Sequence, residues 1–347
     1  MAVVSDNVRF DVRGGLGRVT LDRPRALNAL DHPMVLAITE QLDRWRDDSA
    51  VRAVLIDGAG ERGLCAGGDI RSIYEDARAS GSASLAFWAD EYRLNALIAR
   101  YPKPYVAWMD GIVMGGGVGV SAHGSHRIVT ERSRVAMPEV GIGFAPDVGG
   151  TYLLSRAPGQ LGTHMALTGT AVSGADAIHC GLADHFVPSS RFPDLLDALT
   201  TGTPSEAIAA VADTPPPSRL ASDQGWIDHC YAADSVEEIL ANLHDGGEAA
   251  VATAKEMEGK SPTALKVTLR ALRTALALPL ETVLAQEYRT SHRALRSADL
   301  VEGIRAQIID KDRSPRWTPA SLTEVTDDLV DTYFTTLGTA EWTAGSR

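Results

Sequence analysis

Over about the first 190 residues, short strand-like runs alternate with helical patterns, and this rhythm constrains the fold more than any other feature of the chain. The expected strands, rich in apolar and β-branched residues, are residues 8–12, 18–21, 53–56, 105–109 and 127–129. Glycines at 14, 15 and 17 separate the first two as a hairpin, and apolar residues at three-to-four spacing over 35–45 predict a helix. The rhythm is that of ββα or βαβ units, so we expect an α/β fold with a largely buried sheet.

Beyond about residue 190 the strand signals stop. Residues 213–218 contain three successive prolines and predict a connection, because proline removes N–H donors and fixes φ. Residues 235–295 are helical in pattern, with Ser261 and Pro262 placed as N-cap and first-turn residue. We therefore expect a catalytic core over residues 1–200, and a linker and helical C-terminal region packing on it over residues 201–347.

Composition excludes several classes of protein. The chain of 347 residues carries 33 Lys plus Arg against 45 Asp plus Glu, a formal charge of −12, and no basic segment interleaved with aromatic residues. We expect neither a nucleic-acid nor a membrane partner. Three widely spaced cysteines show no disulfide framework and no metal-ligand spacing, which favours a reducing compartment and no metal site. The first residues show no signal or transit pattern, so we expect a cytoplasmic protein.

Residues 109–124 leave a strand, turn through the glycines at 115–117 and enter a run of small residues. Glycine lets a ligand approach the backbone closely, and N–H groups at a helix start favour a developing anion, so an oxyanion hole is one interpretation. Tight packing or a sharp turn is the other. The spacing fits neither a dinucleotide-binding G-x-G-x-x-G nor a P-loop.

A second loop, residues 62–70, also follows a strand and exposes backbone through small residues. One N–H donor from each loop would make a pair for one carbonyl oxygen, which acyl transfer requires because negative charge develops there. Alternatively, this loop is an ordinary strand-to-helix turn with Asp69 as the cap.

The third stretch, residues 136–150, sets Glu139 and Asp147 among apolar and turn residues. Such surroundings raise the pKa of a carboxyl group, which makes it a usable base or acid near neutrality. Both residues are catalytic candidates, although Asp147 could instead cap a helix that begins at Gly149 or Gly150.

Glu91 falls on the apolar stripe of a helical pattern over residues 85–101, between Phe87 and Leu94. A carboxylate is costly there unless it is paired or used. Either a buried arginine partner or the polar end of a pocket is implied.

Taken together, these stretches resemble the crotonase (enoyl-CoA hydratase/isomerase) superfamily, and within it the 3-hydroxyisobutyryl-CoA hydrolase branch. The resemblance covers nearly the whole chain. The matching segments are residues 22–24 (DRP), 28–30 (NAL), 65–70 (CAGGDI), 91–95 (EYRLN), 103–107 (KPYVA), 114–119 (MGGGVG), 137–139 (MPE), 146–150 (PDVGG), 302–306 (EGIRA), 310–312 (DKD) and 314–317 (SPRW).

The resemblance implies a spiral of ββα turns with a helical C-terminal region, and an acyl-CoA substrate without a metal or other cofactor. By position, the N–H groups of Ala66 and Gly116 form the oxyanion hole, and Glu91, Gly116, Glu139 and Asp147 contact the substrate. The resemblance also indicates Arg23, Arg25, Ala66, Asp69 and Ile70 as contacts of CoA, although a solvated loop explains the two arginines equally well. Relatives often assemble into homo-oligomers, which leaves a homo-oligomer open here.

One departure separates the candidate reactions. Hydratases carry a second glutamate two residues after the glycine triplet, where this chain has Gly119, and glycine cannot transfer a proton. Thioester hydrolysis does not need this second proton-transferring group, because a thiol of pKa about 8.5 leaves with little acid assistance. We therefore expect a hydrolase of a short 3-hydroxyacyl-CoA, with a hydratase or isomerase of the same fold and a non-catalytic acyl-CoA-binding protein as alternatives.

A serine hydrolase is a further alternative, suggested by Ser121 and His123, although the last glycine of G-x-S-x-G is missing. In the expected mechanism, Glu139 activates water or attacks the thioester itself, Asp147 orients the water or manages the proton, and Glu91 helps to bind the substrate.

Overall fold

The computed structural model describes residues 5–345. The chain forms two compact units, each assembled from several segments. Unit 1 comprises residues 1–68, 90–136 and 172–221, as far as they are described, and unit 2 comprises residues 69–89, 137–171 and 222–347. The division into residues 1–200 and 201–347 stays a prediction, and it differs from this spatial grouping.

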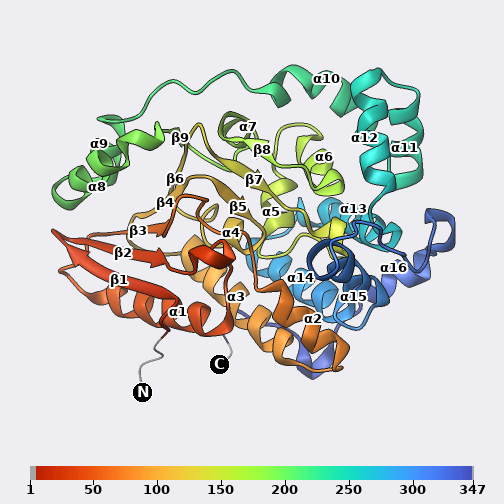
Figure 1. The fold of residues 1–347 in the computed structure, drawn as a ribbon, viewed down its shortest axis with the longest axis horizontal. Helices are drawn as coiled ribbons and strands as arrows, with labels where there is room; N and C mark the ends of the chain where they lie inside the picture. The colour runs from red at the N-terminus through yellow and green to blue at the C-terminus, as the bar shows by residue number, and fades with distance from the viewer. Residues whose placement is uncertain (1–4, 346–347) are drawn as a thin grey trace. The chain divides into compact units, whose positions relative to one another are not determined.

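Unit 1 contains a six-stranded sheet in the order β1-β2-β3-β4-β6-β9 (Figure 1). Its strands are β1 (Val8–Arg13), β2 (Leu16–Leu21), β3 (Ala53–Gly58), β4 (Tyr105–Met109), β6 (His126–Val129) and β9 (His185–Phe186). The β1–β2 hairpin is antiparallel and the other pairings are parallel. Every residue of β4 is buried, as expected for a parallel strand covered on both faces.

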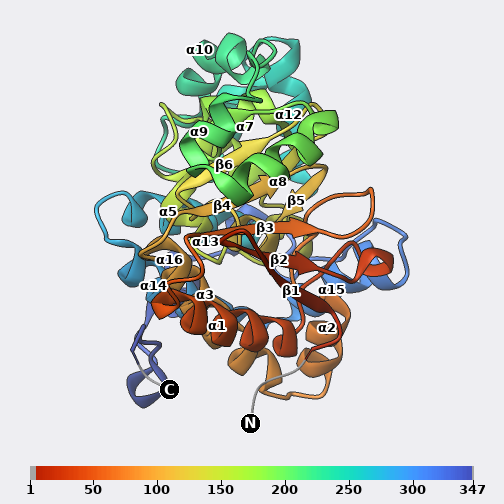
Figure 2. The ribbon, with the colours of Figure 1, turned by 90° about the vertical axis from the view of Figure 1, so that its left-hand side faces the viewer.

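The predicted hairpin is confirmed, with one correction at its glycines. Gly14 and Gly15 form the turn with φ of 56° and 87°, a left-handed conformation that favours glycine. Gly17 lies within β2 instead, where a Cβ atom would come 2.9 Å from the ring of Trp45. The predicted helix over 35–45 is α1 (His32–Asp47), which lies along the hairpin in both views (Figure 2).

A second, three-stranded sheet of unit 1 has the order β5-β7-β8. Its strands are β5 (Ile112–Met114), β7 (Arg134–Ala136) and β8 (Val172–Ser173). After β4 the chain enters the small sheet at β5, returns to the large one at β6 and enters the small sheet again at β7. This alternation is the repeated ββα rhythm that the sequence predicts.

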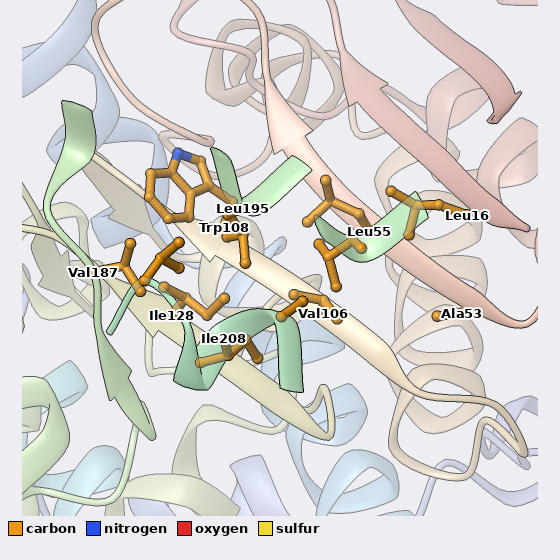
Figure 3. Packing of buried hydrophobic residues seen from close by; sticks show 12 residues of the cluster. Leu16, Ala53, Leu55, Val106, Trp108, Ile128, Val187, Leu195 and Ile208 are labelled. Carbon is orange, nitrogen blue, oxygen red and sulfur yellow. The ribbon is translucent and has the colours of Figure 1, made fainter. Parts of the chain in front are cut away.

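Two helices after residue 190 pack on the large sheet. Leu195 and Ile208 from α8 (Phe192–Thr201) and α9 (Pro204–Ala209) join Leu55, Val106 and Ile128 in one buried cluster (Figure 3). Trp108 stacks on Phe192 with 4.6 Å between ring centroids. The two helices therefore belong to unit 1. Its remaining helices are α4 (Gly116–Gly119) and α7 (Gly174–His179).

Unit 2 is helical. It contains α2 (Ile70–Arg78), α5 (Gly150–Leu154), α6 (Leu161–Thr168), α11 (Val236–His244), α12 (Glu248–Glu258), α13 (Pro262–Ala275), α14 (Leu280–Ala294), α15 (Ala298–Ile304) and α16 (Asp327–Phe334). Two further helices, α3 (Ala83–Ala99) and α10 (Arg219–Tyr231), cross the boundary between the units in sequence. The predicted cap of α13 is confirmed, because the Ser261 hydroxyl accepts from the N–H of Ala264 at 3.0 Å.

All three cysteines of the chain are buried and unpaired. Burial raises the pKa of Cys65 and of Cys180 to about 12, and it also raises the pKa of Cys230. Within the described part of the chain, no helix combines the length and the apolar character needed to span a bilayer.

Candidate functional site

Two glycine-containing loops of unit 1, residues 62–68 and 114–119, run side by side; we call them the donor loops. Backbone hydrogen bonds join them: the N–H of Cys65 donates to Ile112 and the N–H of Met114 donates to Cys65, both at 3.0 Å. A Cβ atom on Gly67 would lie only 3.7 Å from the nitrogen of Gly116. The sequence-predicted pair of loops is therefore adjacent.

The N–H of Gly116 is the first of α4, a position at which helix geometry provides no acceptor. The second predicted donor is engaged, because the N–H of Ala66 donates to the carbonyl of Leu27 at 3.0 Å. Leu27 adopts a left-handed φ of 55°. The oxyanion role of the two N–H groups stays a prediction, and it requires Ala66 to share or exchange its acceptor.

Close packing explains two of the three adjacent glycines. A Cβ atom on Gly116 would come 2.6 Å from Oε1 of Glu91, and one on Gly117 would come 2.4 Å from the carbonyl oxygen of Cys65. Real Cβ atoms do not approach so closely. The packing interpretation is thus confirmed here, and it does not exclude a donor at Gly116.

Glu91 lies on α3 and is only 2% exposed, so its predicted place on the apolar stripe is confirmed. Its carboxylate reaches the start of α4, as its distance from a Cβ on Gly116 shows. The positive end of the backbone N–H groups there favours a negative charge. Glu91 is therefore next to the donor loops and in the same unit.

In unit 2, Glu139 and Asp147 are both buried, with 7% and 6% exposure. Burial, and next the charge of Asp147, raise the pKa of Glu139 well above its ordinary value. The Oε2 atom of Glu139 is buried and has no hydrogen-bond partner among the described residues. A buried carboxyl group with a raised pKa and a free oxygen has the properties of a base or nucleophile near neutrality.

A third carboxylate, Glu287 of α14, was not predicted from the sequence. It accepts hydrogen bonds from the N–H of Gly149 at 2.7 Å and from the N–H and hydroxyl of Thr151 at 2.9 and 2.5 Å. Glu287 is completely buried, and burial, together with a smaller effect of the charge of Asp147, raises its pKa to about 8 against the effect of these donors. We call Glu139, Asp147 and Glu287 the carboxylate cluster.

The carboxylate of Glu287 accepts hydrogen bonds at the start of α5, where the sequence offered Asp147 as a possible cap. The N-cap is Gly149, which has no side chain, and the carboxylate that accepts from the first N–H groups is that of Glu287. Asp147 contributes its backbone carbonyl, which accepts from the N–H of Gly150 at 2.6 Å. Glu287 is thus bound to the turn that carries Asp147.

That turn has an unusual backbone. Val148 adopts a φ of 54° and Gly149 a φ of 79°. A β-branched residue pays a steric cost in the left-handed region, and such strain persists only where the surroundings fix it. The two oxygens of the Glu287 carboxylate accept from the N–H groups of Gly149 and Thr151, directly after Val148. These hydrogen bonds are part of what holds the strained turn in place.

The residues expected to contact CoA have structural partners. Arg23 donates to the carbonyl of Ala29 at 2.8 Å and lies 3.6 Å from Asp31, so it holds its own loop together. Arg25 is exposed in the turn Pro24–Ala26. Their role in binding CoA stays a prediction.

Asp69 accepts from the N–H of Ser72 at 3.4 Å and caps α2, so the capping interpretation is confirmed for this residue. Ile70 is the first residue of that helix. A CoA contact from either residue stays a prediction.

The surroundings of Ser121 do not favour a serine hydrolase. Ser121 is fully buried, and its hydroxyl donates to the carbonyl of Gly117 at 2.6 Å. A nucleophilic serine has its proton directed to a base instead. Across residues 5–345, no group of three His, Cys, Asp or Glu side chains is arranged to hold a metal ion.

Comparison with curated proteins identifies mitochondrial 3-hydroxyisobutyryl-CoA hydrolases as relatives. The protein from Xenopus tropicalis is 43% identical, over 94% of this chain and 88% of its own length. The protein from Homo sapiens is 42% identical, over 97% of this chain and 90% of its own length.

Solved structures agree on the fold and differ in the reaction they name. A structure described as a carnitinyl-CoA dehydratase from Mycobacterium thermoresistibile is 53% identical with a TM-score of 0.96, covering 99% of this chain and all of that one. A structure described as an enoyl-CoA hydratase from Rhodobacter sphaeroides is 42% identical with a TM-score of 0.92, covering 97% of this chain and all of that one. The two agree with the α/β crotonase-type fold that the sequence predicts.

The sequence profile of one family, described as enoyl-CoA hydratase/isomerase, matches residues 16–334. The match spans most of the chain, and the relatives above cover nearly all of it. The chain therefore belongs to the enoyl-CoA hydratase/isomerase family.

Proposed function

We propose that this protein hydrolyses the thioester of a short 3-hydroxyacyl-CoA, with 3-hydroxyisobutyryl-CoA, an intermediate of valine degradation, as the first choice of substrate. The observation that carries the proposal is a contrast between two positions. Glu139 is a buried carboxyl group with a raised pKa, whereas Gly119 stands where the hydratases that the chain resembles carry a second glutamate. The curated relatives, which are named as hydrolases, support the same reaction.

The proposed mechanism assigns the thioester oxygen to the N–H groups of Ala66 and Gly116. Glu139, as the carboxylate, removes a proton from water as that water attacks the carbonyl carbon. The tetrahedral intermediate then collapses, the C–S bond breaks, and CoA leaves as a thiolate that takes up a proton. Asp147 orients the water or manages that proton, and Glu91 binds the hydroxyl end of the acyl group.

A nucleophilic version of the mechanism is also open to Glu139. Its carboxylate would attack the carbonyl to form a mixed anhydride, which water then cleaves. A single turnover in ¹⁸O-labelled water tests this version, because cleavage of the anhydride at the glutamyl carbon leaves label in Glu139. Label confined to the product fits direct attack by water and also cleavage of the anhydride at the acyl carbon.

Hydration or dehydration of an enoyl-CoA is the second candidate, since the two similar solved structures carry such names. The decisive experiment measures thiol release from a panel of 3-hydroxyacyl-CoA esters and loss of enoyl absorbance from crotonyl-CoA, in parallel. We expect thiol release that is lost in Glu139→Gln and Asp147→Asn and retained in Ser121→Ala. Rapid hydration without thiol release would overturn the proposal, and binding without either reaction would select an acyl-CoA-binding protein.

The proposed reaction uses water as its only co-reactant and needs no metal or organic cofactor; activity that survives exhaustive treatment with a chelator would support this. The curated relatives are named as mitochondrial, so the cytoplasmic location stays a prediction, to be tested by fractionation. A homo-oligomer is likewise a prediction, which light scattering of the purified protein tests.

A further inference from the structure

Unit 2 contains a cavity of about 310 Å³ that none of Glu139, Asp147 and Glu287 lines. Its walls come from the start of α13, the end of α14 and the segment around α16. We call it the Arg293 cavity. Its polar lining includes Arg293, Arg296, Thr263 and Asp299, and its apolar lining includes Val267 and Leu329.

Two positive charges of this cavity lack ion-pair partners. Among the described residues, neither Arg293 nor Arg296 forms an ion pair or a side-chain hydrogen bond, and Nε of Arg293 is buried. Two other arginines of unit 2 are paired: Arg289, also on α14, lies 2.6 Å from Glu341, and Arg270 lies 2.7 Å from Asp331. Arg296 is exposed and can be hydrated, whereas a buried guanidinium donor without an acceptor is costly, so Nε of Arg293 suggests a missing partner.

Thr263 adds a second unmet group. This residue is 6% exposed, and its buried Oγ1 atom has no hydrogen-bond partner within the described chain. Its hydroxyl sits on α13, on a different wall from Arg293. Donors on two walls of one cavity can converge on one small ligand.

The acid in the lining, Asp299, makes its hydrogen bonds to groups other than the two arginines. One oxygen of Asp299 accepts from the Ser261 hydroxyl at 2.5 Å and the other accepts from the N–H of Thr318 at 2.7 Å, and burial raises the pKa of Asp299. The two arginines also affect His292: burial first, and then the charges of Arg293 and Arg296, lower the pKa of its imidazole. The lining therefore carries two arginines against one carboxylate, and it is partly apolar; Asp76, outside the lining, also interacts with the charge of Arg296.

We propose that the Arg293 cavity binds a short aliphatic carboxylate. The planar guanidinium is suited to two parallel hydrogen bonds with a carboxylate, and the Thr263 hydroxyl supplies a third donor. The apolar side chains of Val267 and Leu329 accommodate a short aliphatic body. A volume of about 310 Å³ is at the lower end of the range for ligand pockets, which fits a small molecule. This proposal is independent of the reaction proposed above.

The test is calorimetric titration of the full-length protein with isobutyrate, acetate and inorganic phosphate. We expect saturable binding of isobutyrate, tighter than that of acetate and of phosphate. Arg293→Gln should weaken isobutyrate binding by about tenfold or more, because a charge-assisted hydrogen bond is lost. Thr263→Val, which keeps the shape of the side chain, should weaken it less. Arg270→Gln is the matched control and should leave binding unchanged, since Arg270 lies outside the lining and is paired with Asp331.

A second readout locates the ligand. An anion beside Arg293 and Arg296 offsets their charge, so isobutyrate should raise the pKa of His292 in an NMR titration, and Arg293→Gln should abolish that response. Isobutyrate that occupied the catalytic carboxylate region instead would bind Arg293→Gln as tightly as the unaltered protein. That result, the absence of saturable binding, or phosphate binding as tight as isobutyrate binding would each overturn the proposal.

Discussion

The donor loops and the carboxylate cluster differ in how their functional groups respond to pH. The donor loops offer backbone N–H groups, whose charge does not change with pH, and main-chain hydrogen bonds hold them in place. The carboxylate cluster offers three ionisable side chains, two of which have pKa values raised by burial. Changes in the loops should therefore act through steric fit, whereas changes in the cluster should act through proton occupancy.

The largest effect should come from the cluster. Glu139→Gln keeps the size of the side chain but removes the base, so thiol release should fall by about 10²–10⁴-fold. Steady-state kcat with the best 3-hydroxyacyl-CoA ester measures the loss, and unchanged circular dichroism shows that the fold persists. A loss below about fivefold would mean that Glu139 is neither base nor nucleophile.

The matching change in the donor loops is Gly116→Ala. Its Cβ would come 2.6 Å from Glu91 and 3.3 Å from Cδ1 of Leu30, so either the N–H or the glutamate must move. We expect kcat/KM to fall by about 10²-fold, the scale of one lost oxyanion donor, with the pH profile keeping its shape. Gly225→Ala in α10 is the control, because a Cβ there meets nothing within 4 Å. Equal activity in both variants would remove Gly116 from the mechanism.

A smaller effect is expected from Glu287→Gln. The groups that form hydrogen bonds with the Glu287 carboxylate are all donors, so a glutamine must turn an NH₂ group toward one of them and loosen the turn after Asp147. We expect kcat to fall by about tenfold with little change in KM. Where Glu287 is ionised, its charge raises the pKa of Glu139, so the acidic limb of activity should move to lower pH in the variant.

The control for Glu287→Gln is Asp176→Asn. Asp176 is another buried carboxylate that accepts from hydroxyl and N–H groups, but it belongs to unit 1. That variant should lower stability and leave the pH profile unchanged. Matching pH profiles in the two variants would reduce Glu287 to a purely structural group.

The last prediction concerns the pH dependence of folding. Burial raises the pKa of Glu287 from 4.5 to about 8, so the folded protein holds a proton that the unfolded chain releases between these values. This group therefore lowers the free energy of unfolding as pH rises from about 4.5 to 8, by at most about 1.4 kcal/mol per pH unit. Urea unfolding across that range should show that the free energy of unfolding depends less on pH in Glu287→Gln than in the unaltered protein. An identical slope in the variant would show that Glu287 is ionised throughout.

Local patterns predicted the features that depend on nearby residues. Periodicity found α1, β4 and the burial of Glu91, and short apolar stretches found Glu139 and Asp147. These features depend on residues within a turn or two of each other, so a one-dimensional pattern carries them.

Contacts between distant segments were not predicted. Glu287 binds Thr151 across 136 positions, although it lies on the buried stripe of α14 with Val283, Leu284 and Ser291, and the counting that found Glu91 could have identified it. The hydrogen bond from the N–H of Ala66 to the carbonyl of Leu27 depends on a left-handed conformation at Leu27. The sequence does not predict this conformation, because the residue is not glycine. The placement of α8 and α9 on the large sheet likewise depends on tertiary packing.

The buried cysteines also affect how the proposed activity can be measured. A thiolate is the form that reacts with a disulfide reagent, and thiols with pKa values near 12, like those of Cys65 and Cys180, supply almost none of it at neutral pH. A chromogenic disulfide that reports each molecule of liberated CoA should therefore give a nearly flat baseline with the folded enzyme alone. The same baseline would rise as soon as the protein unfolds, so one cuvette can follow turnover and the integrity of the catalyst together.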